Sequence, residues 1–164
     1  TSSKSEELIA RQKDVYDGAV PSGNSVALFN LLRLSRFTAN IYFEKKASVL
    51  VKYFSGFVSR SPSAFCMFMC GLDFQYSIST EIVIVSEKKE SIVTEGLSLI
   101  RSIFNPNKVV ILKTDNFNKD YVELLSFTKD MKLKDNKTTF YVCRDYVCNQ
   151  PVNSITELEK LLLS

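Results

Sequence analysis

The segment Asp17–Ser25 gathers small polar residues in the sequence DGAVPSGNS, a composition suited to binding a polar ligand. Asp-Gly favours a turn, Pro21 stiffens the backbone, and the residues that follow are typical of a helix start. A helix start presents unpaired backbone N–H groups and the positive end of the helix dipole, which attract an anion or a hydroxyl-rich ligand. The candidate ligand-binding residues are Asp17, Ser22, Gly23, Asn24 and Ser25. The alternative is that Ser22 or Asn24 only caps the helix, because caps use the same residue types.

The four cysteines form two pairs, Cys66 with Cys70 and Cys143 with Cys148. The first pair is one helical turn apart in an apolar run, where cysteine usually behaves as a small buried hydrophobic residue. The second pair flanks a predicted strand-turn-strand, whose geometry allows a cross-strand disulfide if the compartment is oxidising. Because the cysteine content is low, we expect reduced thiols there.

The chain contains no histidine, which removes Ser-His-Asp and Cys-His catalysis. A metal site would need all four thiolates at unusual spacings. The common dinucleotide-binding, P-loop and zinc-hydrolase motifs are also absent from the sequence. We therefore expect no complete catalytic site, no metal and no cofactor in this chain.

The bulk composition is that of a globular chain, with 164 residues, 45% hydrophobic and 24% charged. The net charge of +3 comes from scattered basic residues, which argues against nucleic acid as a partner. Asp73 ends the longest apolar run, Phe65–Leu72, well before the roughly 18 residues that a membrane span needs. We expect no nucleic-acid partner, no membrane partner and a cytoplasmic location.

The first region, residues 1–77, has the apolar spacing of helices. The short run Glu7–Arg11 fits either a helical turn or a strand. The predicted helices are Asn24 to about Phe37, Ile41 to about Ser59, and Ser61 to about Tyr76. The third is apolar nearly all round and should be buried on several sides. The residues expected on the inner side of the second helix are Tyr42, Val49, Val51, Tyr53 and Phe54.

The second region, residues 78–164, changes to short β-branched runs at Glu81–Ser86 and Lys108–Lys113, which we expect to be central, parallel strands. Apolar spacing over Ser91–Phe104 predicts a crossover helix between them. The remaining predicted elements are a helix at Lys119–Thr128, strands at Thr139–Cys143 and Tyr146–Cys148, and a helix at Ser154–Leu163 opened by a capping box. The predicted fold class is α/β (α+β), a helical segment followed by a small three-layer α/β unit with a mainly parallel sheet.

The carboxyl ends of the two central strands are a second place for a ligand, because open parallel sheets bind ligands there. The residues concerned are Ser86 and Glu87 after one strand, and Thr114 and Asp115 after the other. Neither end carries a glycine-rich loop. Ordinary loop capping is therefore the favoured interpretation.

Two stretches of the sequence resemble a known family. They are ELIARQKDVYDGAVPSGNSVALFNLLRLSRFT at Glu7–Thr38 and FYVCRDYVCNQPVNSITELEKLL at Phe140–Leu162. Both are similar to segments late in the thioredoxin-domain-containing family that includes the spermatogenesis-associated thioredoxin-like proteins. The resemblance spans nearly the whole chain, with the first motif the more specific.

The resemblance implies a longer protein in which a thioredoxin-like domain and a helical toroid, similar to the six-hairpin glycosidases, precede a terminal α/β portion. Residues 1–77 would be the end of that toroid, with Asp17–Ser25 near the rim of its cavity. The implied partners are the missing N-terminal thioredoxin-like and toroid portions, and the implied ligand is a carbohydrate. Cys143 and Cys148 match family positions, which makes them the redox candidates.

Two functions follow as expectations. The first is a non-catalytic C-terminal portion of a protein that binds or turns over carbohydrate in its intact toroid. Sugar hydrolases need paired carboxylates, and Asp17 alone does not supply the pair. The second is a structural or protein-interaction module without a ligand site of its own, which an exposed apolar helix face would favour.

Overall fold

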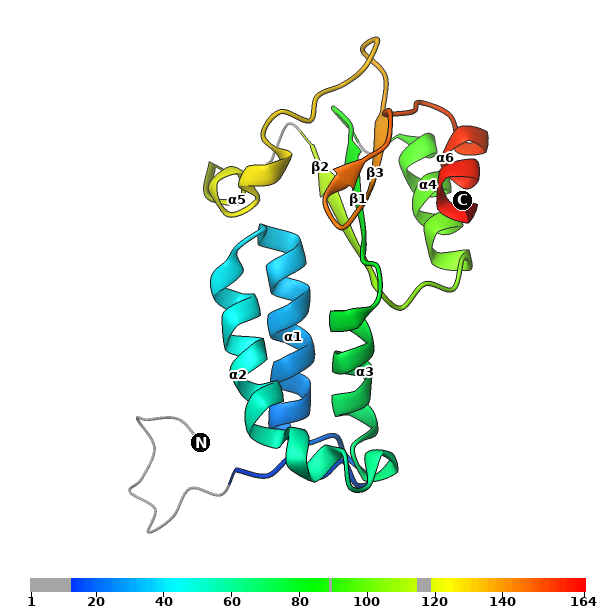
Figure 1. Cartoon of the computed structure of the whole chain (residues 1–164). Coiled ribbons are helices and arrows are strands. Elements are labelled where there is room, and N and C mark those ends of the chain that lie inside the picture. The colour runs from blue at the N-terminus through cyan, green and yellow to red at the C-terminus, as the bar shows by residue number, and fades with distance from the viewer. Residues whose placement is uncertain (1–12, 89, 115–118) are drawn as a thin grey trace.

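The computed structural model describes residues 13–88, 90–114 and 119–164 and is of the α+β class, with three helices at one end and a small sheet at the other (Figure 1). The run Glu7–Arg11 lies outside the described residues. The elements are α1 (Gly23–Thr38), α2 (Ile41–Val58), η1 (Pro62–Ala64), α3 (Cys66–Tyr76), β1 (Thr80–Val85), α4 (Ser91–Ser102), β2 (Lys108–Lys113), α5 (Lys119–Leu124), η2 (Ser126–Thr128), β3 (Thr139–Arg144), β4 (Val147–Cys148) and α6 (Ile155–Leu163). Within the described ranges, no helix combines the length and apolarity that crossing a membrane requires.

Helix α1 is the centre of the helical end. It packs closely against both α2 and α3, whereas those two contact each other much less. The core that they share includes Leu28, Leu32, Phe54, Phe68 and Phe74. It continues into Val109 of β2, so the helical end and the sheet share buried apolar side chains.

The predicted inner face of α2 was partly wrong. Phe54 is buried and Val51 half-buried, but Tyr42, Val49 and Tyr53 are 57%, 64% and 55% exposed. The reason is that α2 packs closely against α1 alone, so that only one stripe of its surface is covered. A helix with apolar residues on two faces gives no periodic signal for which face is inside.

The predicted third helix is divided into two elements. Pro62 begins the short helix η1, and α3 begins only at Cys66. Ser61, at the N-cap of η1, makes no side-chain capping bond, and neither does Phe65 at the N-cap of α3. Another residue therefore has to satisfy the first amide groups of α3.

Helix α3 was expected to be buried on several sides, and this was also wrong. Phe68 and Phe74 are buried, but Cys66 and Cys70 are exposed. The buried pair faces the helical core, whereas the exposed side of the helix meets the loop before β2 at the bond from Asn107 to Asp73.

The sheet has the order β2-β1-β3-β4 and is mostly antiparallel, so the expectation of a mainly parallel sheet was wrong. Strands β1 and β2 are parallel as predicted and are joined through α4. Strand β3 begins opposite the end of β1, with Thr139 paired to Val85, because the chain returns to the sheet at that end. In this order β2 lies at the edge of the sheet, whereas it was expected at the centre. The burial of its residues alternates along most of the strand.

The two faces of the sheet have different covers. One face packs against α4 and α6, with Phe140 and Leu158 fully buried between them. The other face packs against Leu125 and Met131, from the segment that follows α5. The serine half of the predicted capping box of α6 is confirmed, since the Ser154 hydroxyl accepts from the Glu157 amide at 3.3 Å; the Glu157 carboxylate accepts from that same hydroxyl at 2.6 Å.

Candidate functional site

Asp17 joins the starts of two helices that are distant in sequence. Its Oδ1 accepts a hydrogen bond from the backbone N–H of Ser22, the N-cap of α1, at 2.8 Å. Its Oδ2 accepts from the N–H of Phe68, in the first turn of α3, at 2.9 Å. The carboxylate thus supplies the cap that Phe65 lacks, and its negative charge lies at the positive ends of two helix dipoles.

The surroundings of Asp17 favour its charged form. Burial raises the pKa of this carboxyl, but the hydrogen bonds from the Ser22 and Phe68 amides, the Ser25 side chain and the Met67 amide lower it more in sum. The pKa of Asp17 consequently lies below its ordinary value of 3.8. A carboxylate held by several backbone amides is stabilised as the anion, so Asp17 is a poor proton donor.

The other residues of the segment bond within the chain. The Ser22 hydroxyl accepts from the Ser25 amide at 3.1 Å, and the Ser25 hydroxyl donates to the Val15 carbonyl at 3.4 Å. The Asn24 side chain donates to the Asp14 carbonyl at 2.6 Å. The structure thus brings all five candidate residues together and shows Ser22 as the helix cap. Gly23 is exposed, and the ligand-binding role of the five residues stays a prediction.

An aromatic recess of about 240 Å³ lies beside this segment. Its lining includes Tyr16, Tyr53, Phe65 and Asp14, and the Lys13 ammonium lies 5.0 Å from the centre of the Tyr53 ring. The rings of Tyr16 and Phe65 meet edge to face with their centres 6.4 Å apart. Through the bond from Asn24 to Asp14, the recess is connected to the polar segment.

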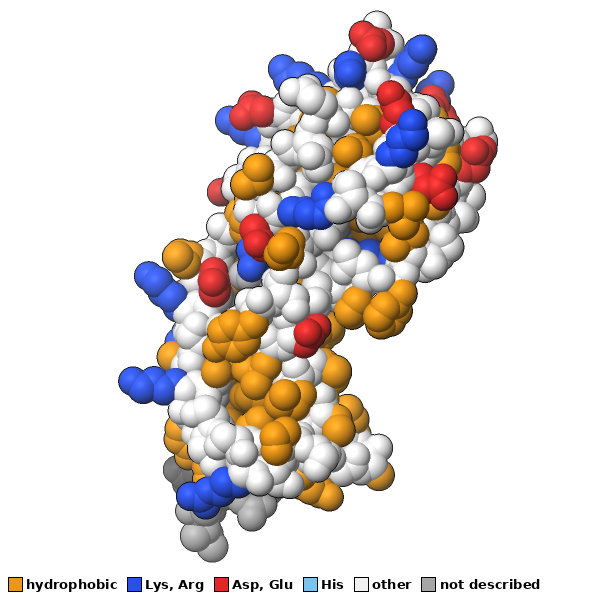
Figure 2. All heavy atoms as spheres, turned by 45° about the vertical axis from the view of Figure 1, so that its right-hand side comes forward, with side chains coloured by type: hydrophobic (Ala, Val, Ile, Leu, Met, Phe, Trp, Pro, Cys, Tyr) orange, Lys and Arg blue, Asp and Glu red, His pale blue; other side chains and the backbone are white. Residues whose placement is uncertain are grey.

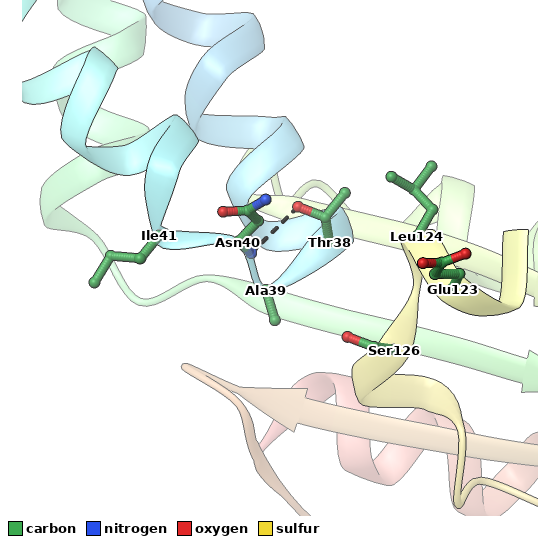
Figure 3. Close-up of a pocket in the computed structure, with 7 residues that line it drawn as sticks. All are labelled: Thr38, Ala39, Asn40, Ile41, Glu123, Leu124 and Ser126. Atoms are coloured by element: carbon green, nitrogen blue, oxygen red, sulfur yellow. Dashed lines mark hydrogen bonds between the residues drawn. The ribbon is translucent and has the colours of Figure 1, made fainter. Parts of the chain in front are cut away.

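A larger recess of about 580 Å³ lies between the α1–α2 turn and the α5–η2 region (Figure 3). Its polar groups serve largely as caps, since Asn40 caps α2 and the Asn40 amide donates to the Thr38 hydroxyl at 3.2 Å. Glu123 is the one charged residue among those described in its lining. A single carboxylate does not make a catalytic pair.

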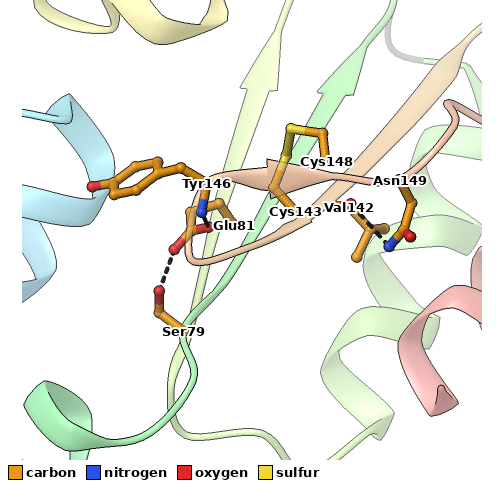
Figure 4. The surroundings of a disulfide bond; sticks show 7 residues. All are labelled: Ser79, Glu81, Val142, Cys143, Tyr146, Cys148 and Asn149. Carbon is orange, nitrogen blue, oxygen red and sulfur yellow. Dashed lines mark hydrogen bonds between the residues drawn. A yellow bond between two sulfur atoms is a disulfide. The ribbon is translucent and has the colours of Figure 1, made fainter.

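Cys143 and Cys148 form a disulfide across the β3–β4 hairpin, which corrects the expectation of reduced thiols (Figure 4). Cys143 is 1% exposed in the core of the sheet, whereas Cys148 lies on the exposed strand β4. The turn between the strands consists of Asp145 and Tyr146, both with a left-handed backbone at φ 46° and 65°. The redox role of the pair is not decided by the bond itself and stays a prediction.

The hairpin turn is held by a fully buried carboxylate, Glu81 of β1. Glu81 accepts from the Tyr146 amide at 3.0 Å and from the Ser79 hydroxyl (Figure 4). The patterns of the sequence did not single out this residue, although a charge at the start of an apolar strand is a visible signal. Burial raises the pKa of Tyr146, whose hydroxyl donates to the Ser35 carbonyl of α1 at 2.8 Å.

The remaining ionisable candidates have structural roles. Burial lowers the pKa of Lys108 and Lys113, whose ammonium groups donate to backbone carbonyls. At the end of β1, the Ser86 hydroxyl bonds to the Lys88 carbonyl at 2.7 Å, which fits loop capping. Asp115 lies outside the described residues. Over the described ranges, no group of three or more potential metal-binding side chains is found.

Comparison with known proteins shows that the sequence of this chain is similar to part of a longer protein. It is 33% identical to spermatogenesis-associated protein 20 of Homo sapiens over 155 residues, which is 94% of this chain and 20% of the relative. The Mus musculus protein of the same name is 33% identical over 156 residues, 95% of this chain and 20% of the relative. An uncharacterized protein of Caenorhabditis elegans is 27% identical over 157 residues, 95% of this chain and 21% of the relative.

The chain thus spans about a fifth of the length of the curated relatives it matches. No family model matches the sequence, and no solved structure matches the chain. The resemblance inferred from the two motifs is confirmed as homology to a part of spermatogenesis-associated protein 20. The toroid stays a prediction.

Proposed function

We propose that this chain is the non-catalytic, C-terminal packing portion of a longer protein and docks through α2 and α3 against further helices of the same polypeptide. The observation that carries the proposal is a second apolar stripe on α2. Its members are Tyr42, Val49, Tyr53 and Phe57, which are 57%, 64%, 55% and 58% exposed. They recur at the spacing of one helix face, beside the buried stripe that contains Phe54, and Lys46 lies among them with its ammonium 5.4 Å from the centre of the Tyr42 ring. A helix that is apolar on two faces is typical of one covered on both sides.

A groove between α2 and α3 supports the same proposal. It has a volume of about 330 Å³, and its lining includes Val51 of α2 and Phe68, Leu72 and Tyr76 of α3. The groove exists because α1 packs against both helices while they contact each other little. Tyr76 at its edge is 75% exposed, so an added helix would bury it.

The apolar surface continues around α3 toward the loop before β2. Figure 2 shows hydrophobic side chains spread over the helical half of the molecule. A cleft of about 580 Å³ there is lined by Phe29, Met69 and Phe104, among others, and Phe104 is 93% exposed. An apolar area of this kind usually marks a surface that contacts other protein.

The occupant that we propose is the rest of the polypeptide. Because the match covers 20% of the human relative, about four fifths of that relative lies outside it. The family resemblance implies toroid helices and a thioredoxin-like domain in that remainder. Toroid helices carry apolar faces of the kind that the α2–α3 groove would receive.

Placing charges on the exposed α2 stripe tests the docking. The double substitution Val49→Lys and Phe57→Lys should lower the free energy of unfolding of the longer protein by roughly 2–4 kcal/mol, because two buried apolar side chains are lost. In the isolated chain, the change should be below about 0.5 kcal/mol. Chemical denaturation of both forms measures this.

Ser48→Lys is the matched control, because Ser48 lies on the polar side of α2 with Lys45 and Lys52. It should be neutral in both forms. An equal effect of the double substitution in the isolated chain and in the longer protein would contradict the docking proposal.

Carbohydrate binding in the intact toroid is the second candidate. The observation that favours it is the aromatic recess beside Asp17–Ser25, which is lined by Tyr16 and Tyr53 together with the polar residues Lys13 and Asp14. Small-ligand sites combine apolar walls with a few polar groups in this way. Asn24, which bonds to the Asp14 backbone, would position the rim.

A thermal-shift screen of the longer protein against a sugar library tests this candidate. A binding sugar should raise the melting temperature by an amount that grows with the logarithm of its concentration relative to its dissociation constant. Asn24→Ala should reduce that shift. A screen in which no sugar shifts the unsubstituted protein would remove the carbohydrate interpretation and leave the docking proposal intact.

A further inference from the structure

The Cys143–Cys148 disulfide closes a turn that is conformationally unfavourable by itself. Asp145 and Tyr146 both have positive φ, which L-residues other than glycine rarely adopt. Hairpin turns of this kind usually contain Asn-Gly or Asp-Gly, because glycine carries no steric cost there. Here tyrosine occupies the second position, so the turn needs support from contacts outside it.

One set of supporting contacts ties the turn to the sheet and to the link between α3 and β1. The Asp145 amide donates to the Ser79 carbonyl at 3.2 Å, and the Ser79 amide donates to the Asp145 carboxylate at 3.3 Å. The Tyr146 amide donates to buried Glu81 at 3.0 Å. The turn therefore completes the hydrogen bonding of a buried carboxylate.

A second set ties the same turn to α1. The Tyr146 ring points to α1 in Figure 4, and its hydroxyl donates to the Ser35 carbonyl at 2.8 Å. The Arg36 guanidinium lies 5.3 Å from the centre of the Tyr146 ring and 3.8 Å from the Asp145 carboxylate. Phe127 packs edge to face on the same ring at 5.9 Å. The two-residue turn thus fastens the helical end to the sheet, and we call it the hairpin latch (Asp145 and Tyr146).

We propose that Cys143–Cys148 is a reversible thiol–disulfide exchange site for a protein or small-molecule dithiol, and that its oxidised form keeps the hairpin latch docked on α1 and Glu81. The inference goes beyond the docking surface, because the latch involves α1, β1 and the β3–β4 hairpin. It is independent of whether α2 and α3 bind further helices.

The difference in burial assigns the order of the steps. A thiolate of the dithiol attacks the sulfur of exposed Cys148, because Cys143 is enclosed in the core. The disulfide breaks, Cys143 takes the leaving electron pair and then a proton, and a mixed disulfide joins Cys148 to the reductant. The second thiol of the reductant, as a thiolate, attacks the reductant's own sulfur in the mixed disulfide, and Cys148 leaves as a thiolate that then takes a proton. Two electrons and two protons reach the protein, and the reductant becomes a cyclic disulfide.

Reduction removes the covalent link between the two ends of the turn. The unfavourable backbone conformation of the turn is then stabilised by noncovalent contacts alone. The chain as a whole should stay folded, because the core between the sheet and helices α4 and α6 contains neither cysteine. The amide protons of Asp145 and Tyr146 should then exchange with solvent about tenfold faster or more, as expected for local opening.

The experiment uses the chain with Cys66→Ser and Cys70→Ser, so that only one cysteine pair responds. It is equilibrated with mixtures of reduced and oxidised dithiothreitol, and mass spectrometry follows the gain of two hydrogen atoms. Hydrogen exchange measured by NMR reports Asp145 and Tyr146, with Val93 of α4 as an internal reference. Faster exchange at the latch with unchanged exchange at Val93 is the predicted result.

Adding Cys143→Ser and Cys148→Ser gives the control, which should exchange at the latch as the reduced form does, with or without dithiol. Tyr146→Phe should speed exchange at the latch in the oxidised form, because the bond to Ser35 is lost. Two results would overturn the proposal. One is equal latch exchange in the two redox forms; the other is a pair that dithiothreitol reduces only after the chain is unfolded.

Discussion

Replacing Asp17 with alanine should lower the free energy of unfolding by about 2–4 kcal/mol, because two charge-assisted hydrogen bonds to helix amides are lost together. The amides of Ser22 and Phe68 would be left without their partner. The loss should also loosen the contact of the Asp17 segment with α3. Chemical denaturation measures the change, and amide exchange at Phe68 localises it.

The same carboxylate predicts the direction of the pH dependence. The pKa of Asp17 is lower in the folded chain than its ordinary value of 3.8, so its stabilisation is fully present above that value. Stability should fall as the pH drops below 3.8 toward the folded pKa, and Asp17→Ala should weaken this fall. Asp14→Ala is the control, because the bond that the Asp14 carboxylate accepts from the Tyr16 amide is local and exposed, and the bond from Asn24 goes to the Asp14 backbone, which the substitution keeps. Equal losses from the two substitutions would show that Asp17 does not bridge the helices.

Replacing Gly96 with alanine should destabilise the chain by about 1–3 kcal/mol, although glycine-to-alanine changes normally stabilise a helix. An added Cβ on α4 would lie 2.5 Å from Cε1 of Phe140, a fully buried ring. Gly56 in α2 has nothing within 4 Å of the same position, so Gly56→Ala should stabilise by about 0.5–1 kcal/mol. Thermal melts of the pair check the opposite signs, and a stabilising Gly96→Ala would show that α4 and β3 are less closely packed.

Much of the fold follows from local patterns. Helix α1, helix α4 and the parallel pair β1–β2 lie where apolar spacing predicted them. The direction of β3 was not predictable, because it depends on where the chain re-enters the sheet and not on the residues of the strand. The inner face of α2 was missed for a related reason, since both of its faces are apolar and periodicity does not say which one has a neighbour.

The site was located by the sequence but only partly explained by it. The DGAVPSGNS segment leads into the start of helix α1, and Ser22 caps that helix. This capping role was one of the two interpretations of the segment. The bond from Asp17 to Phe68 joins residues 51 positions apart, a contact that no local pattern contains. The same applies to Tyr146, whose partner Ser35 is 111 positions away.

The direct test of the docking proposal is hydroxyl-radical footprinting of the isolated chain and of the longer protein. The residues to compare are Tyr42, Tyr53, Phe57 and Tyr76, which are all more than half exposed here. Tyr121 of α5 is the reference, because it is 55% exposed and lies away from the α2–α3 groove. The predicted result is a several-fold decrease in labelling of the four side chains in the longer protein, with the reference unchanged. Equal labelling in both forms would contradict the proposal that α2 and α3 receive further helices.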